Sequence, residues 1–275
     1  MTNPLRLGIS PCPNDVFIFS GLILGRVDTG GLRFHVGYED VETLNQRAQA
    51  GEPYDVVKIS YANYARCAPA YDLLDGGGAL GRGVGPLLLR NGEGAFDPER
   101  EILVPGASTT ANFLLDYFAQ PCPLPQQQRK RFLPFDRLYD ELRRTPGAQG
   151  VVIHEKRFTF ARDGLTLLQD LGEHWEAATG FAIPLGAIVA RRALALNKTL
   201  EHLIRQSLTW AEAHRTDALA LCREHAQDLS DEVMTAHIAL YVNDYSRDLG
   251  EDGRAAVAYF LEQQKVLVRP EGDTR

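Results

Sequence analysis

The chain has 275 residues, enough for two lobes of ordinary size, and its 44% hydrophobic and 24% charged residues are typical of a globular protein. Its formal net charge of −7 comes from 36 acidic and 29 basic side chains, and no segment concentrates Lys and Arg enough to outweigh that background. We therefore expect no nucleic-acid partner.

Residues 1–4 lead directly into an apolar strand-like run, without the charged region and small-residue cleavage site of a signal peptide. The longest apolar stretch, residues 16–24, is interrupted by Ser20 and Gly21 and is shorter than the roughly 18 residues of a membrane span. The four cysteines, at positions 12, 67, 122 and 222, form no CxxC pair and are typical of reduced thiols. These features predict a cytoplasmic protein with no membrane partner.

The first part of the chain alternates short apolar runs with helical patterns, which is typical of βαβ units and a largely parallel sheet. Asn14 and Asp15 follow the first run and are expected to cap the first helix. The expected strands cover residues 5–9, 32–36, 55–59 and 84–89, and the expected helices cover 16–24, 41–50 and a short segment from 60.

A polar, glycine-rich stretch at residues 91–94 is suited to a domain crossing, and a second α/β block follows it. After Ala193 the pattern is purely helical, with Ser230 or Asp228 as a helix cap and a polar tail over residues 269–275. The expected strands here cover 101–104, 131–133, 150–153, 165–168 and a returning 185–190, and the expected helices cover 109–118, 136–144, 200–208, 218–226, 231–242 and 253–266.

Two α/β blocks, two crossings and a helical C-terminus predict a two-lobed α/β fold, hinged like a binding protein, with the C-terminal helices packing on the first lobe. Lobe 1 would combine residues 1–92 and 187–275, and lobe 2 would contain residues 93–186. The active site is expected in the cleft between the lobes, where loops at strand ends face each other.

Residues 76–81 fit G-x-G-x-x-G, the fingerprint of a dinucleotide site. That fingerprint must open a helix, whereas a strand follows here, so we expect no nucleotide cofactor. The glycines are interpreted as turn residues with positive φ angles. Alternatively, the bare backbone around Arg82 lets a ligand or the opposing lobe approach closely.

Residues 10–15, Ser-Pro-Cys-Pro-Asn-Asp, join the first strand to the first helix. The N–H groups of a helix start attract anions, which makes Ser10 and Asn14 candidate binding residues. An ordinary capped turn explains the same residues. Cys12 is a weaker candidate nucleophile, because no histidine lies near it in the sequence.

Two further segments end strands at positions where open α/β sheets place ligand contacts. The hydroxyls of Ser108, Thr109 and Thr110 can cap a helix, or bind a carboxylate together with its N–H groups. In the segment 58–60, Lys58 offers a point charge for a carboxylate, although a strand-end lysine in solvent is the simpler interpretation.

His154 ends the apolar strand-like run at residues 150–153. Its position at the carboxyl end of a buried strand, and an ordinary pKa of about 6.5, favour general acid–base catalysis. Glu155 either orients the ring or forms an ion pair.

A metal site is not expected. His154-Glu155 lacks the second histidine of H-E-x-x-H, and no second ligand pair accompanies Cys222 and His225. The remaining histidines are interpreted as surface or core residues; they are His35, His174, His202, His214 and His237.

Several long strings resemble the 1,4-dihydroxy-6-naphthoate synthase family, and together they cover most of the chain. The strings are residues 10–15 with 17–19, 39–45, 76–86, 109–110, 153–155, 184–188 and 229–233.

This resemblance implies a lyase of the futalosine route to menaquinone with a fold like type II periplasmic binding proteins. Its members convert cyclic dehypoxanthinylfutalosine to 1,4-dihydroxy-6-naphthoate and release a sugar-derived fragment. The family's proton acceptor maps onto His154, and its substrate contacts map onto Lys58-Ile59-Ser60 and Thr109-Thr110. Gly106-Ala107-Ser108 departs from the bulkier, more basic residue of some relatives and leaves the part of Ser108 open.

The resemblance agrees with a small anionic, carboxylate-bearing substrate and with a C–C cleavage that needs a base but no cofactor or metal. Two alternatives remain. Chorismate dehydratase is an enzyme of the same pathway and fold, and a non-catalytic solute-binding protein would share the fold without needing His154.

Overall fold

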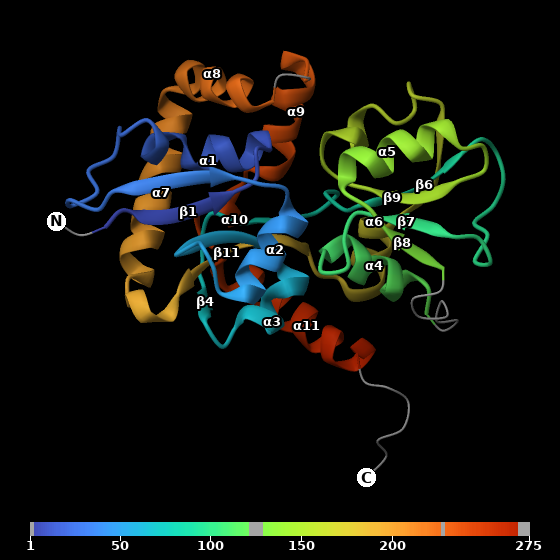
Figure 1. Cartoon of the computed structure of the whole chain (residues 1–275), viewed down its shortest axis with the longest axis horizontal. Coiled ribbons are helices and arrows are strands. Elements are labelled where there is room, and N and C mark those ends of the chain that lie inside the picture. Colours follow the sequence, from blue (N-terminus) through green and yellow to red (C-terminus); the bar gives the residue numbers. More distant parts are fainter. Residues whose placement is uncertain (1–2, 121–128, 227–228, 269–275) are drawn as a thin grey trace, which may run out of the picture.

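The computed structural model describes residues 3–120, 129–226 and 229–268. Figure 1 shows two lobes, one built from both ends of the chain and the other from its middle. The tail at 269–275, the alternative cap Asp228 and Cys122 lie outside the described residues. No helix in the described ranges has the length and apolar character needed to cross a membrane.

The first sheet has the strand order β2-β1-β3-β11-β4, with β5 also paired to β11. β1 runs parallel to β2 and β3, but β11 runs antiparallel to β3, β4 and β5, so the expected largely parallel sheet is wrong. The reason is that β11 returns from the other lobe and enters the sheet from the opposite end. The strands are β1 (Leu5–Ile9), β2 (Phe34–Tyr38), β3 (Val56–Ser60), β4 (Tyr71–Leu73), β5 (Ala79–Gly81) and β11 (Ile183–Arg191).

The second sheet has the order β10-β6-β9-β7-β8 and is also mixed. The sequence pattern places β6 in lobe 1, ahead of a crossing at residues 91–94, but β6 pairs with β9 and β10. The chain therefore crosses between the two sheets after Gly81 and before Leu87, ahead of the expected crossing. The strands are β6 (Leu87–Asn91), β7 (Ile102–Val104), β8 (Lys130–Phe132), β9 (Gln149–Val152) and β10 (Leu165–Asp170).

The C-terminal helices return to the first lobe, as expected (Figure 1). Helix α1 (Pro13–Ile23) packs against α7 (Asn197–Ala213), α8 (Arg215–His225) and α9 (Asp231–Tyr241), and these helices share one hydrophobic core with β1. The other helices are α2 (Val41–Ala50), α3 (Tyr64–Cys67), α4 (Thr110–Phe118), α5 (Phe135–Arg144), α6 (Leu171–Thr179), α10 (Asp244–Arg247) and α11 (Gly250–Val268), with short 3-10 turns η1 (Tyr61–Asn63), η2 (His154–Phe158) and η3 (Arg192–Leu194).

The start of α1 differs from the expectation. Its N-cap is Cys12, without a side-chain hydrogen bond, and Asn14 and Asp15 lie inside the first turn instead of capping it. Pro13 explains the shift, because its fixed φ angle suits the first helical position. The two polar side chains are thereby buried and directed to other partners.

The glycine-rich run leads into β5 and β6 and opens no helix, as expected. Its glycines allow close backbone approach, since a Cβ on Gly78 would lie 2.6 Å from the carbonyl oxygen of Gly186. Gly85 similarly lies against Gly172, the second residue of α6. A Cβ on Gly172 would lie 2.7 Å from Gly85 Cα and 2.6 Å from Ile183 Cδ1.

We expect Gly172→Ala to lower the free energy of unfolding by about 1–3 kcal/mol, the usual cost of overpacking a site that cannot expand. Urea unfolding followed by circular dichroism measures this change. Ala177→Ser, on the exposed side of the same helix, is the control and should stay within about 0.5 kcal/mol of the wild type. A Gly172→Ala protein as stable as the control would contradict the close contact.

Candidate functional site

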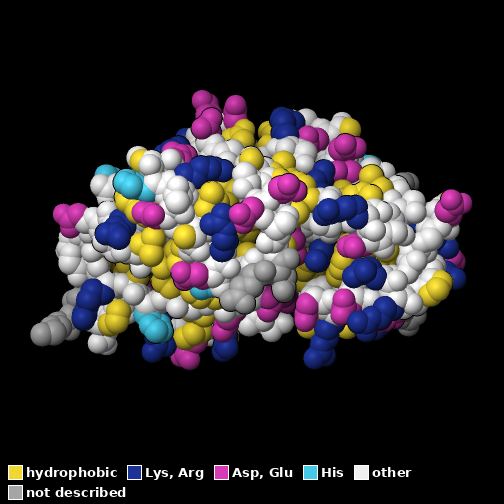
Figure 2. Space-filling view, turned by 90° about the horizontal axis from the view of Figure 1, so that it is seen from above, with side chains coloured by type: hydrophobic (Ala, Val, Ile, Leu, Met, Phe, Trp, Pro, Cys, Tyr) yellow, Lys and Arg dark blue, Asp and Glu magenta, His cyan; other side chains and the backbone are white. Residues whose placement is uncertain are grey.

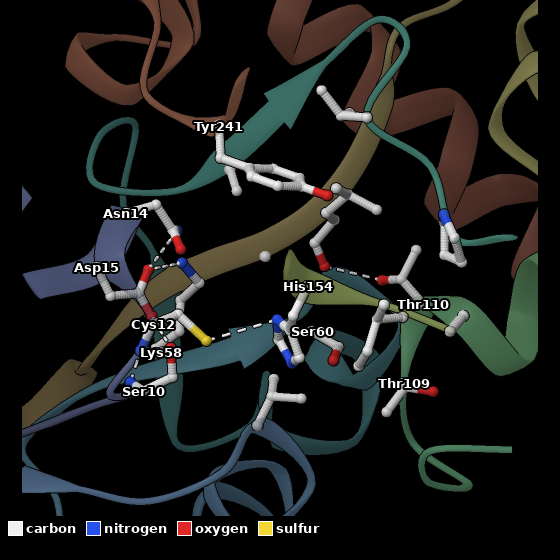
Figure 3. Close-up of a pocket in the computed structure, with 18 of the residues that line it drawn as sticks. Ser10, Cys12, Asn14, Asp15, Lys58, Ser60, Thr109, Thr110, His154 and Tyr241 are labelled. Atoms are coloured by element: carbon white, nitrogen blue, oxygen red, sulfur yellow. Dashed lines mark hydrogen bonds and ion pairs between the residues drawn. The ribbon is translucent and has the colours of Figure 1, made fainter. Parts of the chain in front are cut away.

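A cavity of about 100 Å³ lies between the lobes and is lined from both of them (Figure 3). The start of α1 and the end of β3 contribute one wall, and the N-terminus of α4 and the start of η2 contribute the other. The lining residues that carry polar side chains are Ser10, Cys12, Asn14, Asp15, Lys58, Ser60, Thr109, Thr110, His154, Arg157, His237 and Tyr241.

Lys58 is not a free charge at this cavity, because its ammonium group forms an ion pair with Asp15. Both side chains are buried, with exposures of 6% and 0%. Ser10 Oγ donates to Asp15 at 2.7 Å and Asn14 Nδ2 donates to it at 2.8 Å, so both carboxylate oxygens are hydrogen-bonded. Gly186 makes room for the lysine, since a Cβ there would collide with Lys58 Cε.

The sequence pattern indicates Asp15 only as a helix cap. The signal that could have identified its pairing is an acid in the first helical turn after β1, beside a lysine on β3, the parallel neighbour of that strand. Adjacent parallel strands bring their carboxyl ends to the same edge, where opposite charges can pair.

The side chains of residues 58–60 differ in whether they line the cavity. Lys58 and Ser60 line the cavity, whereas Ile59 is fully buried in the core and does not. Side chains alternate between the faces of a strand, which separates Ile59 from its two neighbours. Ser60 is fixed by Asn45, which accepts from the Ser60 N–H at 2.8 Å and donates to Ser60 Oγ at 3.1 Å.

Thr109 and Thr110 both line the cavity at the N-terminus of α4. Thr109 is the N-cap, accepting from the N–H of Asn112 at 3.2 Å and donating to the carbonyl of Gly106 at 2.9 Å. Thr110 Oγ1 donates to the carbonyl of Leu185 at 2.9 Å and so joins α4 to the segment of β11. The two hydroxyls thus hold the helix start in place beside the cavity.

Ser108 does not line the cavity but is clamped by the other lobe. Its hydroxyl accepts from Arg66 at 2.7 Å and from Gln49 at 3.0 Å, and its N–H donates to the carboxylate of Glu42. Burial raises the pKa of Glu42, and the hydrogen bonds from Asn45 and Ser108 offset only part of that effect. Ser108 therefore joins the two lobes.

His154 follows β9 closely and is the first residue of η2. Its φ angle of 58° lies in the left-handed region, which non-glycine residues rarely adopt. Figure 3 shows its ring in the middle of the cavity, pointing toward Cys12. The distance from Nδ1 to Cys12 Sγ is 3.5 Å, and the edge of the ring meets Phe135 with 5.2 Å between centroids.

The contact between Cys12 and His154 controls the charge of the imidazole. Burial lowers the pKa of His154, but the Cys12 sulfur, Glu155 and Asp15 together raise it to about 9. The fold thus supplies the partner that Cys12 lacks in the sequence. Glu155 adds to the charge effect and also forms an ion pair with Lys156 at 4.0 Å.

Three of the polar side chains that line the cavity are not indicated as site residues by the sequence pattern. Arg157 donates to the carbonyl of Gly85 at 2.6 Å and to Asp170 at 2.7 Å, so it ties η2 to the crossing segment. His237 and Tyr241, one turn apart on α9, complete the wall with their rings 4.6 Å apart.

Arg82, in contrast, donates to the carbonyl of Gly180 and does not line the cavity. No group of three or more His, Cys, Asp or Glu side chains suited to a metal ion occurs in the part of the chain that the structure describes. On the face shown in Figure 2, basic and acidic side chains are intermingled. That no metal, cofactor or nucleic acid takes part stays a prediction.

We expect Lys58→Met to lower the free energy of unfolding by about 3–5 kcal/mol, because it leaves the Asp15 carboxylate buried without its counter-charge. The double variant Lys58→Met with Asp15→Asn removes both charges and should regain most of that loss. Urea unfolding of the two variants and the wild type tests this. If the double variant lost as much stability as Lys58→Met or more, the ion pair would not be what stabilises this region.

The sequence matches the family described as "Menaquinone biosynthesis" over residues 5–265. A relative from Thermus thermophilus named 1,4-dihydroxy-6-naphthoate synthase is 46% identical over 264 residues, which cover 95% of this chain and 94% of that protein. A relative of the same name from Streptomyces coelicolor is 41% identical over 260 residues, covering 94% and 91%.

Solved structures support the fold. A crystal structure from Archaeoglobus fulgidus matches with a TM-score of 0.87 and 29% identity, covering 96% of this chain and 97% of that one. The periplasmic aliphatic sulphonate binding protein of Escherichia coli matches with a TM-score of 0.65 and 11% identity, covering 96% and 89%. The expected periplasmic-binding-protein-like fold is thereby confirmed. With a family match over most of its length and two relatives above 40% identity, the chain belongs to the menaquinone biosynthesis family.

Proposed function

We propose that this protein is a 1,4-dihydroxy-6-naphthoate synthase, a carbon–carbon lyase that converts cyclic dehypoxanthinylfutalosine to 1,4-dihydroxy-6-naphthoate and releases a sugar-derived fragment. The observation that carries the proposal is the position of His154, which reaches from one lobe into a cavity lined by polar residues of both. The relatives named for this reaction support it. Because they are enzymes of biosynthesis, we also place the reaction in the cytoplasm.

The substrate carboxylate is proposed to bind at the N-terminus of α4. Helix starts attract anions through their free N–H groups, and Thr109 and Thr110 fix this one at the cavity wall. Lys58 contributes less to anion binding than expected from the sequence, because Asp15 already neutralises it. Ser10, Asn14 and Lys58 instead shape the opposite wall.

His154 is proposed to accept the proton of a substrate hydroxyl. The electrons of the O–H bond then form a carbonyl as the neighbouring C–C bond breaks, as in a retro-aldol cleavage. The electron pair of the broken bond passes to the ring carbon, which takes up the proton that His154 had accepted, and the ring then becomes aromatic by tautomerisation. No oxidant or reductant is consumed. The cavity between the lobes limits the access of water to the intermediate.

Cys12 supports this step by stabilising the protonated imidazole. Its sulfur faces Nδ1, which leaves Nε2 as the nitrogen able to reach substrate. A partner on one ring nitrogen that favours the imidazolium strengthens the other nitrogen as a base, as the aspartate does in a catalytic triad.

Three candidate functions are separated by one set of incubations. Conversion of cyclic dehypoxanthinylfutalosine to the naphthoate, followed by mass spectrometry, supports the synthase. Dehydration of chorismate, assayed separately, would indicate the sister enzyme, and binding of either compound without conversion would indicate a solute-binding protein.

We expect His154→Asn to lower kcat by at least about 100-fold while leaving substrate binding measurable, since general acid–base catalysis contributes about that much or more. Asparagine is the suitable replacement because it tolerates the left-handed backbone that alanine would strain. His214→Asn, on an exposed residue outside the cavity, is the control. Near-normal turnover by His154→Asn would contradict the assignment of His154 as the catalytic base.

The pH dependence gives a further prediction. If His154 is the base, kcat/KM rises with pH up to about 9, because only the neutral imidazole accepts a proton. In Cys12→Ala burial still lowers the pKa of His154 but the sulfur no longer raises it, so the rise should end at lower pH. Cys67→Ala, which lies outside the cavity, should leave the profile unchanged. A kcat/KM that falls as the pH rises toward 9 would contradict the role of His154 as the base. A rise that ends at the same pH in Cys12→Ala as in the wild type would contradict the effect of Cys12 on it.

A further inference from the structure

His237 carries a buried hydrogen-bonding atom that the proposed reaction does not yet use. The side chain is 1% exposed and lines the cavity from α9. Its Nε2 lies 3.0 Å from Asn14 Oδ1, whereas its Nδ1 is buried and has no hydrogen-bond partner among the described residues. A buried polar atom without a partner is uncommon in proteins and calls for an explanation.

The hydrogen bonds around Asn14 determine which nitrogen of His237 carries the proton. Asn14 Nδ2 donates to Asp15 at 2.8 Å, and Asp15 is held in turn by Lys58 and Ser10. The amide oxygen of Asn14 therefore faces His237 as an acceptor, and Nε2 must donate to it. Burial, with His154 and Lys58 nearby, lowers the pKa of His237 to about 3, so the ring is neutral. Nδ1 is left with a free lone pair.

A neutral acceptor selects one kind of ligand group. A carboxylate has no proton to donate to Nδ1, whereas a hydroxyl group does. The neighbouring Tyr241 ring, 8% exposed and 4.6 Å from the His237 ring, adds an apolar face beside the acceptor. An acceptor next to an aromatic ring suits a sugar, which presents hydroxyls at its edge and C–H groups on its face.

The two ends of the cavity differ accordingly. In Figure 3, Thr109 and Thr110 lie on one side, Asn14 and Asp15 lie on the other, and His154 stands between them. Asn14 is the residue to which His237 is hydrogen-bonded. A substrate with its carboxylate at α4 would therefore extend its sugar-derived part toward His237, across the base.

We propose that His237 Nδ1 accepts a hydrogen bond from a hydroxyl of the sugar-derived part of the substrate, which orients the bond to be cleaved at His154. This subsite rests on the proposed function for the identity of the sugar. The hydrogen-bonded series Lys58–Asp15–Asn14 positions this acceptor, because it holds the proton of His237 on Nε2 and leaves Nδ1 without one.

Two substitutions of similar size separate the two ring nitrogens. His237→Gln places an amide near the position of Nε2, so it can still donate to Asn14 but has no acceptor at the position of Nδ1. His237→Asn places an amide near Nδ1, so it can supply the acceptor while losing the bond to Asn14. A purely structural role for His237 predicts the reverse order, because the Asn14 bond is the one that the protein itself makes.

We expect His237→Gln to lose about tenfold in kcat/KM for cyclic dehypoxanthinylfutalosine, as removal of one hydrogen bond usually costs, and His237→Asn to lose less. The dissociation constant for 1,4-dihydroxy-6-naphthoate, which lacks the sugar, should not change in either variant. His214→Gln is the matched control. Equal losses for both ligands, or wild-type kinetics in His237→Gln, would overturn the proposal.

A spectroscopic measurement keeps the test independent of turnover and of the stability of these variants. In ¹⁵N-labelled His154→Asn, the His237 Nδ1 resonance, assigned by its absence from His237→Gln, should move on adding cyclic dehypoxanthinylfutalosine and stay in place on adding the naphthoate. An unmoved resonance in the presence of bound substrate overturns the subsite. If the resonance moves but the wild type does not convert the substrate, the proposed function fails while the hydroxyl subsite stands.

Discussion

The buried ion pair between Lys58 and Asp15 organises the wall of the cavity that belongs to the first lobe. Neither charge reaches solvent, so each needs the other, together with the hydrogen bonds from Ser10 and Asn14. The pair joins the first turn of α1 to the end of β3. The ion pair also constrains the sequence of β11, because a Cβ at Gly186 would collide with the Lys58 side chain.

The second wall is attached to the first by a few specific contacts. Thr110 binds the carbonyl of Leu185, Ser108 is clamped by Arg66 and by side chains of α2, and His154 meets Cys12. Each of these contacts places a polar group of the second lobe against the first lobe at the edge of the cavity. The same contacts that bring the lobes together therefore also assemble the site.

Local sequence patterns were sufficient for most elements of this fold. Apolar periodicity located the central strands and the C-terminal helices, and the hydroxyl of Thr109 marked the start of α4. The same patterns do not indicate β4, β5, α6 or α10. Three-residue strands, a four-residue helix and a helix directly following a strand give too little periodicity to recognise. The direction of β11 could not be predicted either, since it depends on how the chain returns from the other lobe.

The candidate site shows the same division between local and distant information. The position of His154 after an apolar strand is a local signal and could be read directly. Its contact with Cys12 joins residues 142 positions apart, and the Asn14–His237 bond joins residues 223 apart. Neither contact can be inferred from residue spacing. The sequence pattern therefore gives Cys12 no partner and indicates only a surface or core position for His237.

The left-handed backbone of His154 also determines at which stage the side chain is oriented, during folding or during substrate binding. A non-glycine residue in this conformation costs about 1–2 kcal/mol, and it persists only where the surrounding structure holds it. Here β9 fixes the chain on one side and η2 on the other. The free-energy cost of this φ angle is therefore part of the folding free energy. Under the proposed function, the imidazole is therefore in position before substrate binds, and no part of the binding energy is needed to orient it.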